Sequence, residues 1–407
     1  MSLHVTVAYI FNPDSIASEL GDPRWTTLIQ VARELKLRGH CVQMLPINQG
    51  TVRAVQRVRN SSLLQNLIRE FGTQKCERGK PDNLRMRAPC RPSGRTDVAI
   101  LWSNYNGNYF RAVPRVVYEN GFTRGTVIVD PRGLLGDSFY VRSLNSLVQR
   151  GYDDSRCRLL VQRHLELDSS KRPQQSILDV PAHVFNSRYV FVPTQKFDDV
   201  SVNKFSHITY PDLLNQTCSY CSSRTLPLVV KIHPAIDGPE KAQQRRLLLR
   251  LNESACGWLL FESSSSINLL TTHARFTVTL NGGTLVDNFY TGTPVLTLAR
   301  SLFQHTDAVV SHSNVQAGLE RMASVTWTET NRLRQRQVAC WIERASLSTT
   351  KTPAENIATI EMHLRHHHGA AGLAVSLAPV NSSCAISPPQ SGSHGSVQLP
   401  TFGSATS

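Results

Sequence analysis

The chain has 407 residues, of which 40% are hydrophobic and 18% charged, so it holds enough apolar material for more than one packed domain. Its net charge of +14 favours a polyanion, an anionic lipid surface or an acidic substrate as partner. The sequence shows no signal-peptide pattern and no apolar run near about 18 residues. We therefore expect a cytoplasmic protein whose membrane contact is at most peripheral, on an anionic surface.

The cysteines and histidines predict no metal site. Nine cysteines at irregular spacing favour reduced thiols in a cytosolic setting. Cys218 and Cys221 form a lone C-x-x-C, which is more typical of a turn between helix and strand than of a zinc site. The run of three histidines at residues 366–368 follows a predicted helix and is expected to be solvated. We expect neither a metal nor another cofactor, because no Asp-x-Asp motif ends a strand either.

The first 150 residues predict a Rossmann-like domain. A strand over residues 5–11, a helix over 27–38 and a strand over 42–46 form the β-α-β start of a doubly wound sheet, without the G-x-G-x-x-G turn of dinucleotide folds. The basic stretch over residues 72–95 is interpreted as a solvated insertion. Strand patterns resume at 98–102 and 126–130, and the segment from Glu119 to Phe122 is placed in the turn between a helix and a strand.

The rest of the chain predicts a second sheet and a tail. Helical residues 151–185 connect the two domains, and strands are expected at 189–193, 228–233, 258–261, 276–280 and 295–298, within a second Rossmann-like domain over 186–350. A final helix follows over 351–368. Residues 369–407 are rich in Ser, Pro, Gly and Ala, a composition that predicts a disordered tail.

Two segments carry the strongest chemical signal, because each places charged groups directly after an apolar strand. Open α/β sheets build their sites at the carboxyl ends of strands. After the strand over 189–193 stand Gln195, Lys196, Phe197, Asp198 and Asp199. After the next strand stand Lys231, Ile232, His233 and Pro234. These carboxylates and cations predict chemistry on an anionic substrate at one edge of the sheet.

These segments resemble the motifs of the capsule polysaccharide Kdo transferases. That family carries Gln-x-x-Asp-Asp-x-Ser-Ile and then Lys-x-His-Pro after two strands, in the order and spacing found here. Further similar segments are Ser266 to Leu270, Asn281 to Thr284, Gly292 to Val295, Glu119 to Phe122, and Asp130 to Gly133. Gly282 departs from the pattern, because the family usually has serine there. The resemblance covers about residues 95 to 310.

The resemblance implies a GT-B-like α/β fold, with an acceptor-side domain over residues 1–150 and a nucleotide-sugar domain over 186–350 facing it across a central cleft. It implies a glycosyltransferase that moves Kdo from CMP-Kdo to a glycan or glycolipid acceptor in capsule or surface polysaccharide synthesis. It also implies that some members retain anomeric configuration through a covalent sugar-aspartate intermediate, with the Glu of the first-domain motif as acid/base; Glu119 occupies that position here.

The chemistry of a CMP-sugar agrees with this interpretation. Lys231 and His233 suit the phosphate of the departing CMP, and the turn of Asn281, Gly282, Gly283 and Thr284 can present N–H groups and a hydroxyl to the donor. Gln195 belongs to the same donor-binding set. Adjacent residues of an extended chain point to opposite sides, so only one of the two acids should face the substrate. Asp199 is the predicted catalytic carboxylate, and Asp198 is predicted to orient or cap nearby.

Less specific interpretations remain for each of these residues. Lys231 could end a strand in solvent, Glu119 could cap a turn, and residues 281–284 could form a plain glycine turn. Two other functions stay open: a GT-B transferase with another donor such as a UDP-sugar, and a basic protein that binds nucleic acid or polysaccharide without turnover. Specific nucleic-acid binding is not expected, because aromatic residues make up only 7% of the chain and are not interleaved with the basic clusters.

Overall fold

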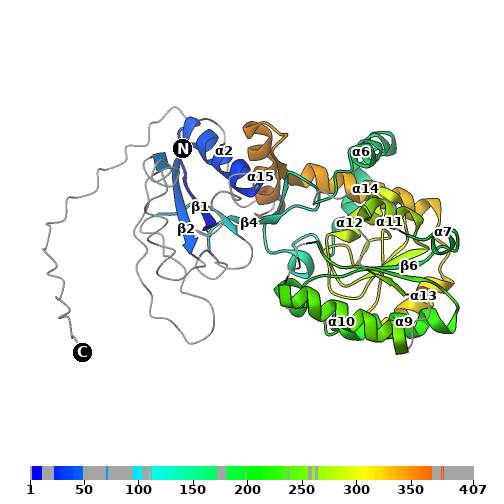
Figure 1. The fold of residues 1–407 in the computed structure, drawn as a ribbon. Helices are drawn as coiled ribbons and strands as arrows, with labels where there is room; N and C mark the ends of the chain where they lie inside the picture. The colour runs from blue at the N-terminus through cyan, green and yellow to red at the C-terminus, as the bar shows by residue number, and fades with distance from the viewer. Residues whose placement is uncertain are drawn as a thin grey trace, which may run out of the picture.

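The computed structural model describes residues 2–11, 23–48, 70–71, 95–102, 110, 112–171, 180–197, 199–234, 236, 238–254, 259–261, 265–368, 377 and 379. The predicted tail over 369–407 and the basic stretch over 72–95 therefore lie almost wholly outside the described residues, and so does Asp198. The described residues form two α/β domains, each built on a six-stranded sheet (Figure 1). None of the described helices has both the length and the apolar character needed to span a bilayer.

The first sheet has the strand order β12-β5-β4-β3-β1-β2. Strands β1 to β4 run parallel, while β5 is antiparallel to both β4 and β12. The central strand β3 is apolar and buried along its whole length, as expected for a parallel strand covered by helices. The elements are β1 (His4–Phe11), α2 (Pro23–Leu37), β2 (Cys41–Asn48), β3 (Val98–Trp102), β4 (Arg115–Asn120) and β5 (Thr126–Asp130).

The segment around Glu119 corrects a sequence-based expectation. Glu119 and Asn120 end strand β4 and pair with Ile128 and Val127 of β5, rather than lying in a turn between a helix and a strand. The turn that follows closes an antiparallel hairpin through the bond from Gly121 N to Thr126 O at 2.9 Å. The sequence Arg115 to Tyr118 is short and flanked by charge, so its strand pattern was hard to recognise.

The second sheet is wholly parallel and has the order β11-β10-β9-β6-β7-β8. Numbered along the chain within this domain, that is the 3-2-1-4-5-6 order of the Rossmann fold, with its switch point between β6 and β9. All five strands predicted from the sequence are present, and the structure has a sixth strand, β11, that was not predicted. The strands are β6 (Val190–Pro193), β7 (Leu228–Lys231), β8 (Leu259–Phe261), β9 (Phe276–Thr279), β10 (Val295–Thr297) and β11 (Val310–Ser311).

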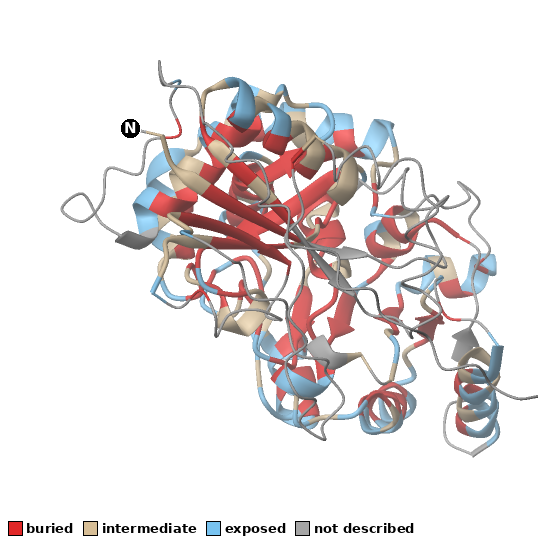
Figure 2. Cartoon of the chain, turned by 90° about the vertical axis from the view of Figure 1, so that its left-hand side faces the viewer, coloured by how far each residue is buried: buried red, intermediate tan, exposed pale blue. Residues whose placement is uncertain are grey.

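Helices cover both faces of the second sheet (Figure 1). Val190 and Val192 pack toward α9, α10 and α13, while Phe191 between them packs toward α7 and α11. This alternation follows from the two-residue repeat of a strand. Strands β6, β7, β9 and β10 are buried along their whole length (buried residues are red in Figure 2). The helices are α7 (Ala182–Asn186), α8 (Val200–Phe205), α9 (Tyr210–Ser223), α10 (Gly238–Ser254), α11 (Ile267–His273), α12 (Thr284–Thr291) and α13 (Val315–Ser324).

A third apolar cluster joins the domains. It brings Ile128 of β5 and Tyr140 together with Phe289 of α12 and Trp341 of α14. The chain then returns to the first domain, where β12 pairs with β5 and α15 packs on α2. The predicted domain boundaries stay a prediction. The remaining elements are η3 (Leu135–Asp137), α5 (Leu144–Gly151), α6 (Asp154–Glu166), α14 (Glu329–Ala345), β12 (Ser346–Ser348) and α15 (Pro353–His368).

The cysteines differ from expectation in two ways. Cys218 and Cys221 lie inside α9, both buried, and not in a turn between helix and strand. Cys157 of α6 and Cys340 of α14 form a disulfide with each other. Cys41 and Cys218 each take part in a separate disulfide, so the prediction of reduced thiols is wrong for these four residues. The spacing of the cysteines did not predict the Cys157–Cys340 disulfide, because 183 positions separate its two members.

We expect reduction of the Cys157–Cys340 disulfide to lower the free energy of unfolding by about 3 kcal/mol, because the bond restricts a long loop of the unfolded chain. Chemical denaturation of wild type and of Cys157→Ser/Cys340→Ser, each with and without dithiothreitol, measures it. In the double variant the reductant should have a smaller effect than in wild type. Peptide mapping without reductant that finds both thiols free would contradict the assignment.

Candidate functional site

Three of the predicted site segments meet at one edge of the second sheet. Strands β6, β7 and β9 are parallel, so their carboxyl ends lie at the same edge. Gln195 follows β6, Lys231 ends β7, and Asn281 follows β9. The edge includes the switch point between β6 and β9, where open α/β sheets bind their ligands.

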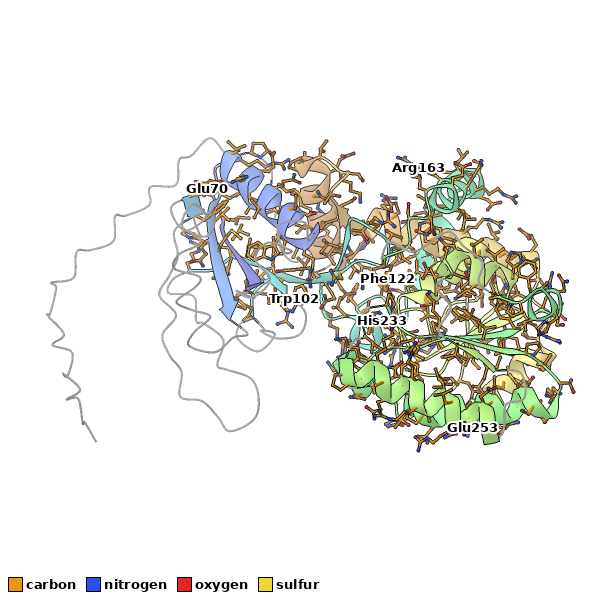
Figure 3. All side chains as sticks on the ribbon, in the orientation of Figure 1. Glu70, Trp102, Phe122, Arg163, His233 and Glu253 are labelled. Atoms are coloured by element: carbon orange, nitrogen blue, oxygen red, sulfur yellow. A yellow bond between two sulfur atoms is a disulfide. The ribbon has the colours of Figure 1, made fainter. Side chains whose placement is uncertain are left out.

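Thr194 links the ends of β6 and β7. Its N–H donates to Lys231 O at 2.9 Å, and its Oγ1 accepts from His233 N at 3.1 Å. The same hydroxyl donates to Gln244 Oε1 of α10 at 2.9 Å. These bonds fix the backbone of His233, which lies on the side of the second domain that faces the first (Figure 3).

Gln195 is held against the glycine turn after β9. Its Oε1 accepts from the Tyr210 hydroxyl at 2.9 Å, and its carbonyl accepts from Gln244 Nε2 at 3.0 Å. A Cβ on Gly282 would stand only 3.0 Å from Gln195 Cδ. The glycine that departs from the family motif therefore makes room for Gln195. Sequence reasoning missed Tyr210, the first residue of α9, and Gln244, in the second turn of α10, because neither belongs to a recognisable motif.

We expect Gly282→Ala to displace Gln195 and to weaken about tenfold the binding of any ligand that contacts Gln195, since the new Cβ would also approach Gln195 Nε2 and Oε1 at 3.2 Å. Gly151→Ala at the end of α5 is the control, because its Cβ would meet nothing within 4 Å and the residue lies outside the site. Isothermal titration with CMP compares the two variants. Equal affinities for both would show that Gln195 makes no contact with the nucleotide.

Lys231 is a buried cation. Its side chain is 7% exposed, and Nζ donates to Ser265 O at 2.8 Å. Burial lowers the pKa of Lys231 to about 8, because the ammonium has lost much of its hydration. An anion that binds beside such a group would interact with it strongly, because charges attract more strongly in a poorly solvated place.

Asp199 stands directly before α8, at the N-cap position. Its carbonyl accepts from Val202 N and Asn203 N, each at 3.0 Å. Burial raises the pKa of Tyr210, and the negative charge of Asp199 adds to this effect. Asp199, Tyr210 and Gln195 thus belong to one neighbourhood at the switch point. Asp198 lies outside the described residues, so its orienting role stays a prediction.

The turn after β9 contributes backbone groups. Asn281 and Gly282 are buried, and α12 begins at Thr284 with Gly283 as its N-cap. The N–H groups of Leu285 and Val286 already donate to Gly282 O and Gly283 O, at 3.2 and 2.9 Å. The start of a helix is nevertheless a place that favours an anionic or polar ligand group. This is the position that the sequence predicted for contact with the donor.

Glu119 belongs to a separate cluster on the first domain. Its Oε1 accepts from Asn120 N at 2.8 Å and pairs with Arg24 Nη1 at 3.3 Å. The Arg24 guanidinium in turn lies 4.2 Å from the centre of the Trp102 ring at the end of β3. Figure 3 shows Trp102 on the side of the first domain that faces the second. Sequence reasoning missed Arg24 and Trp102.

The Asp130 carboxylate organises a loop. It accepts hydrogen bonds from Arg132 N, Gly133 N and Phe139 N at 2.8, 3.0 and 3.1 Å, and from the hydroxyl of Ser138. Burial raises its pKa, although these bonds oppose the shift. The Asp130 carboxylate therefore holds the loop after β5 in place, and this structural role accounts for the Asp-x-x-Gly pattern of the segment.

Neither a metal cluster nor the observed cavity coincides with this edge. Among the described residues, no group of three or more His, Cys, Asp or Glu side chains could hold a metal ion. A cavity of about 900 Å³ lies along β11 and α13, and its lining includes His312, Arg321 and Trp327 but none of the predicted site residues.

Two α/β domains, one with Rossmann and one with flavodoxin-like strand order, define the class of protein as GT-B-like. No family model and no curated protein matches the chain. Similar solved structures include two of KpsC from Thermosulfurimonas dismutans. Its beta Kdo 2,4 transferase is 14% identical, with a TM-score of 0.47 over 83% of this chain and 90% of that chain. Its beta Kdo 2,7 transferase is 15% identical, with a TM-score of 0.42 over 83% of this chain and 89% of that chain.

A UDP-GlcNAc 2-epimerase from Methanocaldococcus jannaschii is also similar, at 10% identity and a TM-score of 0.36 over 84% of this chain and 99% of that chain. At identities this low, a likeness concerns the fold alone and says nothing of the reaction.

Proposed function

We propose that the protein is a glycosyltransferase that moves a sugar from a nucleotide donor, CMP-Kdo, to a glycan or glycolipid acceptor of surface polysaccharide synthesis. The observation that carries the proposal is the meeting of Gln195, Lys231, His233 and the turn of residues 281–284 at the switch-point edge of a Rossmann-type sheet. The motif resemblance in residues 195–202 and 231–234 supports the choice of donor.

In this proposal the second domain holds the donor. Lys231 supplies a positive charge and His233 a directed hydrogen bond to the phosphate of CMP, and both interactions strengthen as negative charge builds on the leaving oxygen. Gln195 and the N–H groups of the turn at 281–284 hold the rest of the nucleotide. No metal ion is required, since these groups neutralise the phosphate.

The proposed chemistry is a double displacement. The Asp199 carboxylate attacks the anomeric carbon, the bond to the phosphate oxygen breaks, and CMP departs with the electron pair. An acceptor hydroxyl then attacks the same carbon while Glu119 accepts its proton, and the bond to Asp199 breaks to restore the carboxylate. Two inversions give overall retention. Glu119 and Asp199 come from different domains, so the sugar must bind between the sheets.

Thermal-shift and calorimetric binding of CMP, UMP, UDP and a random oligonucleotide tests the donor assignment, because a ligand of the folded state raises apparent stability. We expect stabilisation by CMP alone, lost in Lys231→Ala. A response to UDP in its place would assign a UDP-sugar transferase. A response to the oligonucleotide with steep salt dependence would assign a nucleic-acid-binding protein. Turnover of CMP-Kdo with a glycan acceptor then tests the reaction itself.

A further inference from the structure

Helix α6 carries an exposed apolar surface that the proposed reaction does not use. Five large hydrophobic side chains are exposed in the described part of the chain, and three of them lie on or directly after α6. Leu159, Leu165 and Leu167 are 68%, 39% and 59% exposed. Leu37 and Leu249 lie singly on other helices. A single exposed leucine needs no explanation, but three between positions 159 and 167 do.

The opposite side of α6 is fixed to the second domain. Cys157 is bonded to Cys340 of α14, and the His164 ring stacks on Tyr290 of α12 with 3.5 Å between ring centres. Arg336 Nε donates to Asp154 Oδ1 at 2.8 Å. These contacts from two helices fix the rotation of α6, so its exposed leucines cannot turn into the core.

Two of the three leucines, Leu159 and Leu167, share the outward side of α6 with basic side chains, whereas Leu165 lies only about 80° around the helix from Cys157. At 3.6 residues per turn, Leu159 lies about 200° around the helix from Cys157, Arg163 about 240° and Arg156 about 260°. Figure 3 shows Arg163 on the outer surface of α6. We call Arg156, Leu159, Arg163 and Leu167 the α6 face.

The charges of the α6 face are available to a partner. Within the part of the chain that the structure describes, Arg156 and Arg163 form no ion pair, whereas Arg158 is paired with Asp154 at 2.7 Å. The nearby Glu166 carboxylate already accepts a hydrogen bond from Gln162 Nε2 at 2.8 Å. An anionic surface is therefore the complementary partner for the two arginines.

We propose that the α6 face docks the protein on an anionic membrane. The leucines enter the boundary between headgroups and acyl chains, and the two arginines bind lipid phosphates while their stems cover apolar surface. The net charge of +14 adds longer-range attraction. The inference does not depend on the proposed reaction, although a glycolipid acceptor would be presented on the same surface.

Co-sedimentation of the full chain with vesicles tests the proposal. We expect binding to phosphatidylcholine vesicles with about 30% phosphatidylglycerol, and much weaker binding to phosphatidylcholine alone or at high salt. Leu159→Ser/Leu167→Ser and Arg156→Gln/Arg163→Gln should each reduce the partition coefficient about tenfold. Leu249→Ser, on α10 and 48% exposed, is the matched control and should bind as wild type does.

Sedimentation velocity without lipid decides the main alternative. A wild type that dimerises, and becomes monomeric in Leu159→Ser/Leu167→Ser, would assign the α6 face to contact between two copies and overturn the membrane proposal. Absence of vesicle binding by the wild type would overturn it as well. So would equal loss of binding in Leu249→Ser, because a general effect of surface leucines would then explain the result.

Discussion

Asp199→Asn should abolish sugar transfer while leaving the protein folded and able to bind CMP. The substitution removes the nucleophilic carboxylate but keeps a residue that is equally favoured at a helix N-cap, so α8 should begin at the same residue. We expect the rate to fall by at least about 10³-fold, in the range seen when a covalent nucleophile is removed. Single-turnover assays with CMP-Kdo measure the rate, and calorimetry measures CMP affinity.

Glu253→Gln is the control for Asp199→Asn. Glu253 is an exposed carboxylate on α10, far along the helix from the switch-point edge (Figure 3). Its loss of one negative charge should leave the rate unchanged. Mass spectrometry of Asp199-containing peptides, quenched during turnover of Glu119→Gln, should detect the sugar adduct, because the second step then lacks its base. Full activity of Asp199→Asn would remove this residue from the reaction.

The second domain could be predicted well from the sequence, because each of its strands is a short apolar run followed by polar residues. The run from Tyr189 to Pro193 and the run ending at Lys231 both form strands of the parallel sheet. Parallel strands carry their functional residues at one edge, so sequence position alone placed Gln195, Lys231 and Asn281 together. The side-chain geometry at this edge was not predictable, since Tyr210 and Gln244 come from helices that carry no motif.

The first domain was predicted less completely, for physical reasons that differ between elements. Strand β4 was missed because Arg115 and Glu119 interrupt its apolar pattern. Strand β12 was missed because Ser346, Leu347 and Ser348 are paired through a contact far away in sequence, with β5. Local patterns contain no information on such partners. The same limit hid the disulfide that holds α6 to α14.

Lys231→Met should weaken CMP binding and slow transfer about 10²-fold, a loss of about 3 kcal/mol of transition-state stabilisation, because the ammonium faces charge that develops on the leaving phosphate. Methionine keeps the apolar stem in the buried position and removes the charge. The alternative is that Lys231 only braces the chain at Ser265, through the 2.8 Å bond of its Nζ. Lys231 bonds the backbone carbonyl of Ser265, so no side-chain substitution at residue 265 removes the bond. The affinity for CMP must therefore distinguish the two roles of Lys231.

The pH dependence separates these two roles of Lys231. Its pKa is about 8 in the folded protein against 10.5 for an ordinary lysine. Between these values the unfolded chain binds more protons, so wild-type stability should rise with pH, and Lys231→Met should lack this rise. A phosphate that binds the ammonium favours its charged form, so CMP binding should take up a proton above pH 8, and affinity should fall about tenfold per pH unit.

Calorimetry in buffers of different ionisation enthalpy measures that proton uptake directly. A lysine that only braces residue 265 would give the stability change with pH but no proton uptake on CMP binding, and Lys231→Met would bind CMP as wild type does. A lysine that binds the phosphate must show both effects. Lys231 would then be a cation that stays buried at a cost in stability below pH 8 and whose charge is used in binding the donor phosphate.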